Sequence, residues 1–134
     1  MTTVPEFRAA VLAALDAQAN LDVFDGRPAY RSDGDGRAHI AATLHMGVGA
    51  PDPLQQTLAG GRPLVGLTFQ VTAAGGDVER CVLAARKIRA ALTDQVLAGA
   101  GFCREDSGML FPREDRDVTP SVWFLPMIYR VDIP

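Results

Sequence analysis

The sequence predicts an α/β sandwich, an α+β arrangement in which two helices pack on one face of a mostly antiparallel sheet of about five strands. The strongest indication is residues 64–92, where a strand pattern runs through a short glycine turn into an amphipathic helix. Apolar residues alternate at 65–71 and then recur every three or four positions at 78–92. A second alternating pattern closes the chain at 122–133. The expected element order is α-β-β-β-α-β-β.

The first helix is expected to begin at the N-terminal end of the sequence and to end near Ala19 or Asn20. Thr3 and Glu6 have the spacing of a capping box, and Pro5 lies in the first turn, where its missing N–H has no cost. The expected packing face repeats at helical spacing and consists of Phe7, Ala10, Val11, Ala14 and Leu15. All of its large residues are apolar, so this face is expected to fill a core.

The remaining elements are bounded by turn residues, chiefly glycine and proline. They are strands at 21–24 and 38–46, a loop at 32–36, a connection at 47–62, a strand at 64–72, a turn at 73–76, a helix from Asp77 that stops by about Gly99, a strand at 102–105, a charged connection at 104–120 and a strand at 122–133. Within the first long connection, Asp52 is placed to cap a short helical turn that ends at Gly60-Gly61. Pro126 cannot donate to a ladder, so the last strand is expected to be an edge strand or to carry a bulge.

Length and composition favour a single globular domain and argue against several classes of protein. The chain has 134 residues, of which 48% are hydrophobic, and this length suits one domain spanning 1–134. A net charge of −3 argues against a nucleic-acid-binding surface as the main function. Residues 1–6 lack the basic and apolar regions of a secretory signal, and no apolar run approaches the roughly 18 residues of a membrane span. We therefore expect a protein made and folded in a cytoplasm.

The residues that most often carry chemistry form no catalytic pattern. His39 and His45 are expected on one strand, on one face and roughly 20 Å apart, which is too far to share a metal ion. The sequence Asp33-Gly-Asp-Gly36 resembles the start of a calcium loop but lacks the later oxygen ligands, so a turn is favoured. Cys81 is expected as a reduced thiol in the core. We accordingly expect no catalytic site, no metal, no cofactor and no enzymatic activity.

The charged connection is the candidate functional region. Its acidic and basic residues are interleaved, and they comprise Arg104, Glu105, Asp106, Arg113, Glu114, Asp115, Arg116 and Asp117. Such a mixture is most often a solvated loop. The alternative is a self-complementary contact between identical subunits, because a symmetric assembly can pair a charged loop with a matching patch on the neighbour.

Four segments, in this order, resemble the tail terminator (tail completion) proteins of long-tailed bacteriophages, prophages and gene-transfer particles. They are Val4-Pro-Glu-Phe-Arg through Val23-Phe-Asp-Gly-Arg-Pro28, His39-Ile-Ala-Ala-Thr-Leu44, Leu67-Thr-Phe-Gln-Val-Thr72 with the helix ending Lys87-Ile-Arg-Ala-Ala-Leu92, and Val122-Trp-Phe-Leu-Pro-Met-Ile-Tyr-Arg-Val131. The resemblance is one of layout over most of the chain, and the family has no catalytic motif to match.

The resemblance implies a structural virion protein at the head-proximal end of the tail. Such a subunit forms a six-membered ring on the tail tube, stops tube polymerisation and offers a docking surface for the head connector. Its partners would be copies of itself, the tail tube protein and the head–tail connector protein, with DNA only passing through the channel. Two other hypotheses stay open: a neighbouring connector or minor tail protein, and a small cytoplasmic ligand-binding or enzymatic domain.

Overall fold

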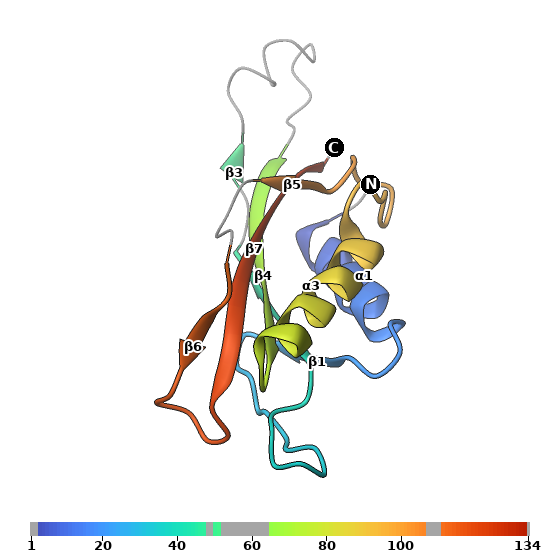
Figure 1. Ribbon diagram of the computed structural model, residues 1–134. Helices are drawn as coiled ribbons and strands as arrows, with labels where there is room; N and C mark the ends of the chain where they lie inside the picture. Colours follow the sequence, from blue (N-terminus) through green and yellow to red (C-terminus); the bar gives the residue numbers. More distant parts are fainter. Residues whose placement is uncertain (1–2, 48–49, 52–64, 107–110, 134) are drawn as a thin grey trace, which may run out of the picture.

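The computed structural model describes residues 3–47, 50–51, 65–106 and 111–133, which form two helices packed on one face of a sheet (Figure 1). In chain order the described elements are α1 (Val4–Asp16), β1 (Asp22–Asp25), β2 (Ala41–Met46), β3 (Ala50–Pro51), β4 (Val65–Gly75), α3 (Val78–Leu92), β5 (Arg104–Asp106), β6 (Arg113–Asp115) and β7 (Val122–Ile133). The helical turn expected from Asp52 lies outside the described residues.

The sheet has seven strands within the described residues. Its order is β1-β2-β4-β7-β5, while β3 pairs with β4 and β6 pairs with β7. The β1–β2 pairing is parallel, and the other described pairings are antiparallel. The predicted α+β class is therefore confirmed, and the structure adds two short strands, β3 and β6. Each has only two or three residues, which is too short for an alternating pattern to be recognised.

Helix α1 begins where the capping pattern places it and ends earlier than expected. The Thr3 hydroxyl accepts a hydrogen bond from the Glu6 N–H at 3.2 Å, and the Thr3 N–H donates to the Glu6 carboxylate at 3.0 Å. The helix ends at Asp16, so the expected end near Ala19 or Asn20 is wrong. The φ angle of Asn20 is +60°, a left-handed conformation that asparagine tolerates and that turns the chain into β1.

Strand β4 is longer than its alternating pattern, because it includes Ala73 and Ala74, which were expected in a turn. Both residues pair with β2 on one side and β7 on the other. The turn itself is made at Gly76, where an added Cβ would lie 2.6 Å from the Ala38 backbone nitrogen. Small residues here let the loop before β2 approach the end of β4 closely.

Helix α3 begins at Asp77, whose carboxylate accepts a hydrogen bond from the Arg80 N–H at 2.8 Å. It ends at Leu92, where the apolar repeat of the sequence ends, since Thr93 is extended and Asp94 is left-handed with φ +59°. Its buried residues are Cys81, Ala84, Ala85, Ile88, Ala91 and Leu92. Val78 was expected on this face, yet it is 42% exposed because it lies in the first turn, beyond the sheet contact.

Aromatic rings join the helices to the centre of the sheet. The Phe7 ring meets the Phe69 ring edge-on at 5.7 Å between centroids, and the Phe69 ring stacks on the Tyr129 ring at 5.5 Å. The Tyr129 hydroxyl lies 3.0 Å from the Thr93 hydroxyl, just after α3, and burial raises the pKa of Tyr129 to about 12. Contacts of this kind each add about 1 kcal/mol beyond area burial, so α1, β4, β7 and α3 form one cooperative core.

Strand β7 lies inside the sheet, so the expectation of an edge strand or a bulge at Pro126 is wrong. Its pairing with β4 runs without a break from Trp123 to Ile133. On its other side, β5 pairs with residues 128–130 and β6 with residues 122–124. Pro126 therefore lies between the stretch of β7 that pairs with β5 and the stretch that pairs with β6, and neither described strand pairs with it.

Candidate subunit interface

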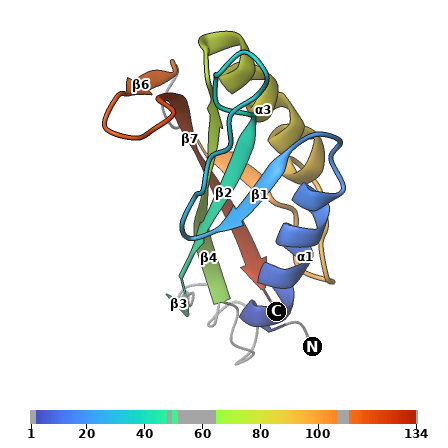
Figure 2. The same ribbon diagram turned by 90° about the horizontal axis from the view of Figure 1, so that it is seen from below.

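The helices cover one face of the sheet, and the described residues place no helix on the opposite face (Figure 2). We call this second surface the open face. On β4 and β7 it is formed by alternate residues, namely Thr68, Gln70, Thr72, Phe124, Pro126, Ile128 and Arg130. All of these residues are at least partly exposed. The open face therefore offers a sheet surface on which another molecule can pack.

One end of the open face is closed by the chain itself. A small cluster of buried residues lies there with partly buried neighbours, and it consists of Ala38, Ala41, Ala74 and Val122 with Phe24, Tyr30 and Val118. The Phe24 and Tyr30 rings meet edge-on at 6.3 Å. Burial, assisted by the charge of Asp115, raises the pKa of Tyr30, so its hydroxyl is neutral at physiological pH. The accessible part of the open face is thus the part toward β5.

The eight residues of the charged connection do not form one continuous loop, which corrects the sequence interpretation. Arg104, Glu105 and Asp106 form β5, Arg113, Glu114 and Asp115 form β6, and Arg116 and Asp117 lie in the following turn. Both strands pair with β7 and together form one outer edge of the sheet. β7 pairs with β4 on one side, and it is long enough for both β5 and β6 to pair along its other side.

Glu105 is fixed to the helix layer instead of being a freely solvated charge. The Arg89 guanidinium on α3 donates to both carboxylate oxygens of Glu105, at 3.0 Å from Nε to Oε2 and 3.0 Å from NH2 to Oε1. The carboxylate raises the pKa of Arg89 through this hydrogen bond. Bidentate geometry restricts both side chains, so the ion pair holds β5 against α3 at the edge of the sheet.

The β6 end of the edge is held by short-range contacts. The Arg116 guanidinium lies 3.2 Å from the Glu114 carboxylate, and the Asp117 N–H donates to the Asp115 carboxylate at 3.0 Å. The first pair is highly exposed at Arg116 and contributes little stability. Phe111, just before β6, is 76% exposed. The β6 end is therefore ordered by local contacts and is accessible to solvent.

Arg104 and Arg130 form an uncompensated pair of like charges on the open face. They lie directly opposite each other in the β5–β7 register. Neither guanidinium makes a hydrogen bond or ion pair with any part of the chain that the structure describes. Like charges directly across a strand pair are destabilising. Arg104 belongs to the charged connection that local composition singles out, whereas Arg130 does not, because only the register brings the two together.

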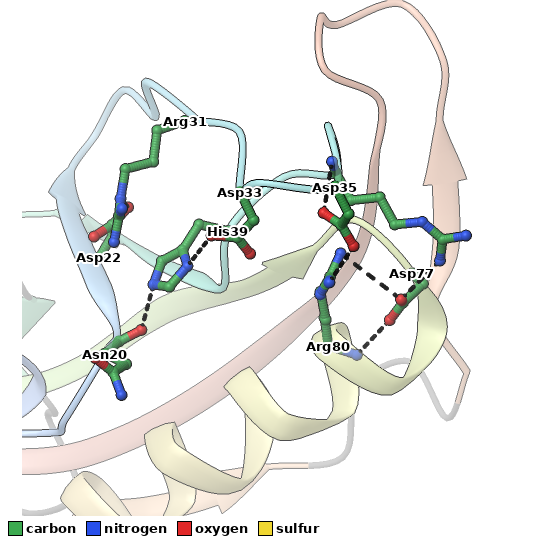
Figure 3. Close-up of polar contacts among 9 residues, drawn as sticks. Asn20, Asp22, Arg31, Asp33, Asp35, His39, Asp77 and Arg80 are labelled. Carbon is green, nitrogen blue, oxygen red and sulfur yellow. Dashed lines mark hydrogen bonds and ion pairs between the residues drawn. The ribbon is translucent and has the colours of Figure 1, made fainter.

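A second polar region ties the 26–40 loop to α3 and β1 (Figure 3). Arg80 on α3 donates to the Asp35 carboxylate at 2.6 Å, and Arg37 donates to the Asp77 carboxylate at 2.9 Å. The hydrogen bond from Arg80 lowers the pKa of Asp35, and the backbone N–H of Arg80 lowers the pKa of Asp77. Asp35, which was expected in a plain turn, is therefore bound by an arginine of α3, and this contact fixes the loop.

The two histidines do not share a strand, which corrects the sequence interpretation. His45 is exposed on β2, whereas His39 precedes that strand and is largely buried in the loop region of Figure 3. Its Nδ1 lies 2.8 Å from the Asp33 carboxylate and its Nε2 lies 2.6 Å from the Asn20 carbonyl oxygen. The ring thus contacts a polar oxygen on each side. His39 thus fastens the loop to the turn between α1 and β1.

The two cysteines are buried and unpaired. Burial raises the pKa of the Cys81 thiol to about 12 and that of the Cys103 thiol to about 11. Both thiols are therefore protonated at neutral pH and poorly nucleophilic. The expectation of Cys81 as a buried, reduced thiol on the apolar side of α3 agrees with its position in the core.

Comparisons with known proteins add no family. No protein-family model and no curated protein matches this sequence. In the described part of the chain, no group of three or more His, Cys, Asp or Glu side chains is placed to hold a metal ion. Neither described helix is long and apolar enough to cross a membrane. The features that remain as a candidate site are the open face and the β5–β6 edge.

Proposed function

We propose that this chain is a structural ring subunit of a phage-like tail, placed at the head-proximal end of the tail tube. In this role the ring terminates tube polymerisation and presents a docking surface to the head connector. The observation that carries the proposal is the open face with its charged β5–β6 edge. In the described residues it is a sheet surface without a helical layer, and a pair of arginines on it has no partner among those residues.

The resemblance to tail terminators supports the same assignment. Its four segments correspond to α1 with β1, to β2, to β4 with α3, and to β7, which are the elements that build the sheet and its core. The net charge of −3 also suits a ring through which DNA passes, because a strongly basic lining would hold the phosphates.

The proposal is tested by assembly. Size-exclusion chromatography with light scattering, followed by electron microscopy, should find hexameric rings, either free at high protein concentration or on purified tail tubes. Tubes mixed with the protein should stop growing and carry one ring at one end. Bovine serum albumin added at the same concentration is the control for non-specific binding. A strict monomer that leaves tube growth unchanged would refute the proposal.

Two alternatives are separated by further measurements. A neighbouring head–tail connector would bind the connector complex without halting tube growth. A ligand-binding domain is favoured by one observation, a hollow of about 540 Å³ between α1 and the end of β2, lined in part by Val4, Leu12 and Met46. A metabolite that binds there would raise the melting temperature selectively in a thermal-shift screen.

A further inference from the structure

Two surfaces near opposite edges of the sheet each carry charged side chains in an unfavourable local setting, although β5 itself also contains Glu105 and Asp106. Strand β5 is at one end of the strand order and β1 is at the other. At the β5 edge, Arg104 and Arg130 face each other without a carboxylate partner in the described chain. Asp132 lines the same hollow as the two arginines but forms no ion pair with either of them. We call the surface of Phe102, Arg104 and Arg130 the arginine edge.

At the β1 edge the unfavourable charge is Asp16. It is the last residue of α1, and the final turn of this helix contains no basic residue. A carboxylate there meets the negative end of the helix dipole, which is the wrong sign for stability. In the described chain Asp16 has neither an ion pair nor a side-chain hydrogen bond, whereas the neighbouring Asp25 is paired with Arg8. Asp16 is therefore available to a cation from outside the chain.

Apolar surface accompanies each of these charges. On the arginine edge, Phe102 is 55% exposed and borders the same hollows as Arg104. At the β1 edge, Asp16 borders a hollow of about 330 Å³ that is also lined by Leu12 and Val23. We call this second surface the acidic groove. An exposed aromatic ring beside arginines and an apolar groove beside a carboxylate are complementary in charge, and both offer apolar surface to bury.

We propose that the arginine edge of one copy of this chain docks into the acidic groove of the next copy. The inference rests on the proposed ring, and it names the two surfaces that meet in it. Because the surfaces differ and lie at opposite edges of one sheet, the contact is head-to-tail, the kind that closes a ring of more than two subunits. The contact relieves both unfavourable settings at once, since Asp16 gains a cation and the two arginines gain an anion.

The test uses two charge-reversal variants. Copies of the same variant should repel each other at the contact, whereas copies of the two different variants should attract each other. One variant is Arg104→Glu with Arg130→Glu, and the other is Asp16→Arg. In either variant alone, every head-to-tail contact places like charges together. In an equal mixture, an alternating ring places opposite charges at every contact, and a ring with an even number of subunits closes. Arg86→Glu is the matched control, because Arg86 is an exposed arginine of α3 that borders neither surface.

Assembly is measured by sedimentation velocity and by electron microscopy on tail tubes. Each variant alone should need about tenfold or more protein than the wild type for half-assembly, whereas the mixture should assemble nearly as well as the wild type. Arg86→Glu should have no effect. Circular dichroism and thermal melts check folding. If a reversal unfolds the chain, Arg104→Gln and Asp16→Asn replace it, and a weaker salt dependence of assembly than in the wild type is the expected result.

The possible failures are distinguishable. Rings that form equally well from the wild type, from each reversal and from the neutral variants would overturn the edge contact while leaving the ring proposal intact. A mixture that assembles no better than its components would also overturn the contact. A wild-type chain that forms no ring, alone or on tail tubes, would refute the proposed function and the contact together.

Discussion

The two faces of the sheet are made by the same strands but have different chemistry. On β4, the side chains facing the helices are Leu67, Phe69 and Val71, which are buried, while the intervening residues on the open face are polar and at least partly exposed. A side-chain period of two separates these sets completely. Stability is therefore concentrated on the helix-covered face, and the open face contributes less to the core. Substitutions on the two faces should affect different measurements.

The largest expected effect is the loss of a central ring on the helix-covered face. Phe69→Ala removes the ring that contacts both Phe7 and Tyr129, and it should lower the free energy of unfolding by about 3–5 kcal/mol. Urea denaturation followed by circular dichroism measures this change. Thr68→Ala is the matched control on the open face of the same strand, and it should change stability by less than about 0.5 kcal/mol. Similar losses in both variants would contradict the division between the faces.

A smaller effect is expected at the start of α3. Asp77→Ala removes the carboxylate that accepts the Arg80 N–H, and it should cost about 1 kcal/mol in unfolding free energy. Asp77→Asn keeps a capping oxygen and should lose less. Chemical denaturation of the three proteins in parallel gives the ranking. If Asp77→Asn and Asp77→Ala lower the unfolding free energy equally, the ion pair between Asp77 and Arg37 contributes more than the helix cap.

The same region predicts an acid sensitivity. The pKa values of Asp35 and Asp77 are lowered from the ordinary value of 3.8 in the folded chain. A lowered folded-state pKa stabilises the protein fully above pH 3.8, and this contribution is lost as pH falls below 3.8 through the folded-state values. Melting temperatures measured between pH 6 and pH 2 should therefore fall less steeply for the Asp35→Asn, Asp77→Asn double variant. An unchanged slope would show that other carboxylates dominate the acid response.

The smallest effect on stability is expected at the β6 edge. Reversing charge with Arg113→Glu and Arg116→Glu should change unfolding free energy by less than about 0.5 kcal/mol, because both residues are exposed. Assembly on tail tubes should weaken by a larger factor than this change in stability implies. Parallel thermal melts and light scattering compare the two quantities. Equal losses would mean that the edge belongs to the fold and is not a contact surface.

The sequence patterns predict well the elements whose residues repeat over several turns or pairs. The Thr3–Glu6 capping box and the alternation in 122–133 place α1 and β7 at their observed starts. The apolar repeat at 78–92 also places the end of α3 at Leu92. The expected end of α1 was wrong, because the chain turns out of this helix toward the left-handed residue Asn20. Such residues leave no periodic signal in the sequence.

The candidate site was only partly accessible to sequence reasoning. Local composition was enough to single out the charged residues of β5 and β6. The arginine pair depends on register, because Arg130 lies 26 positions after Arg104 and meets it only through the pairing of two strands. Asp16 gave no signal either, since its unfavourable position follows from where α1 actually ends. Long-range pairing and exact boundaries are the information that one sequence alone does not provide.

The interruption opposite Pro126 has a consequence for how copies of this chain can aggregate. An unbroken exposed strand is a template on which further strands can add without limit, as in fibrils. In the described residues the β5–β6 edge consists of two three-residue strands, and the part of β7 between their pairing partners contains Pro126. Neither piece is long enough to template another strand. Growth by backbone pairing is thereby discouraged at this edge, so the contacts of the proposed ring would be made by side chains.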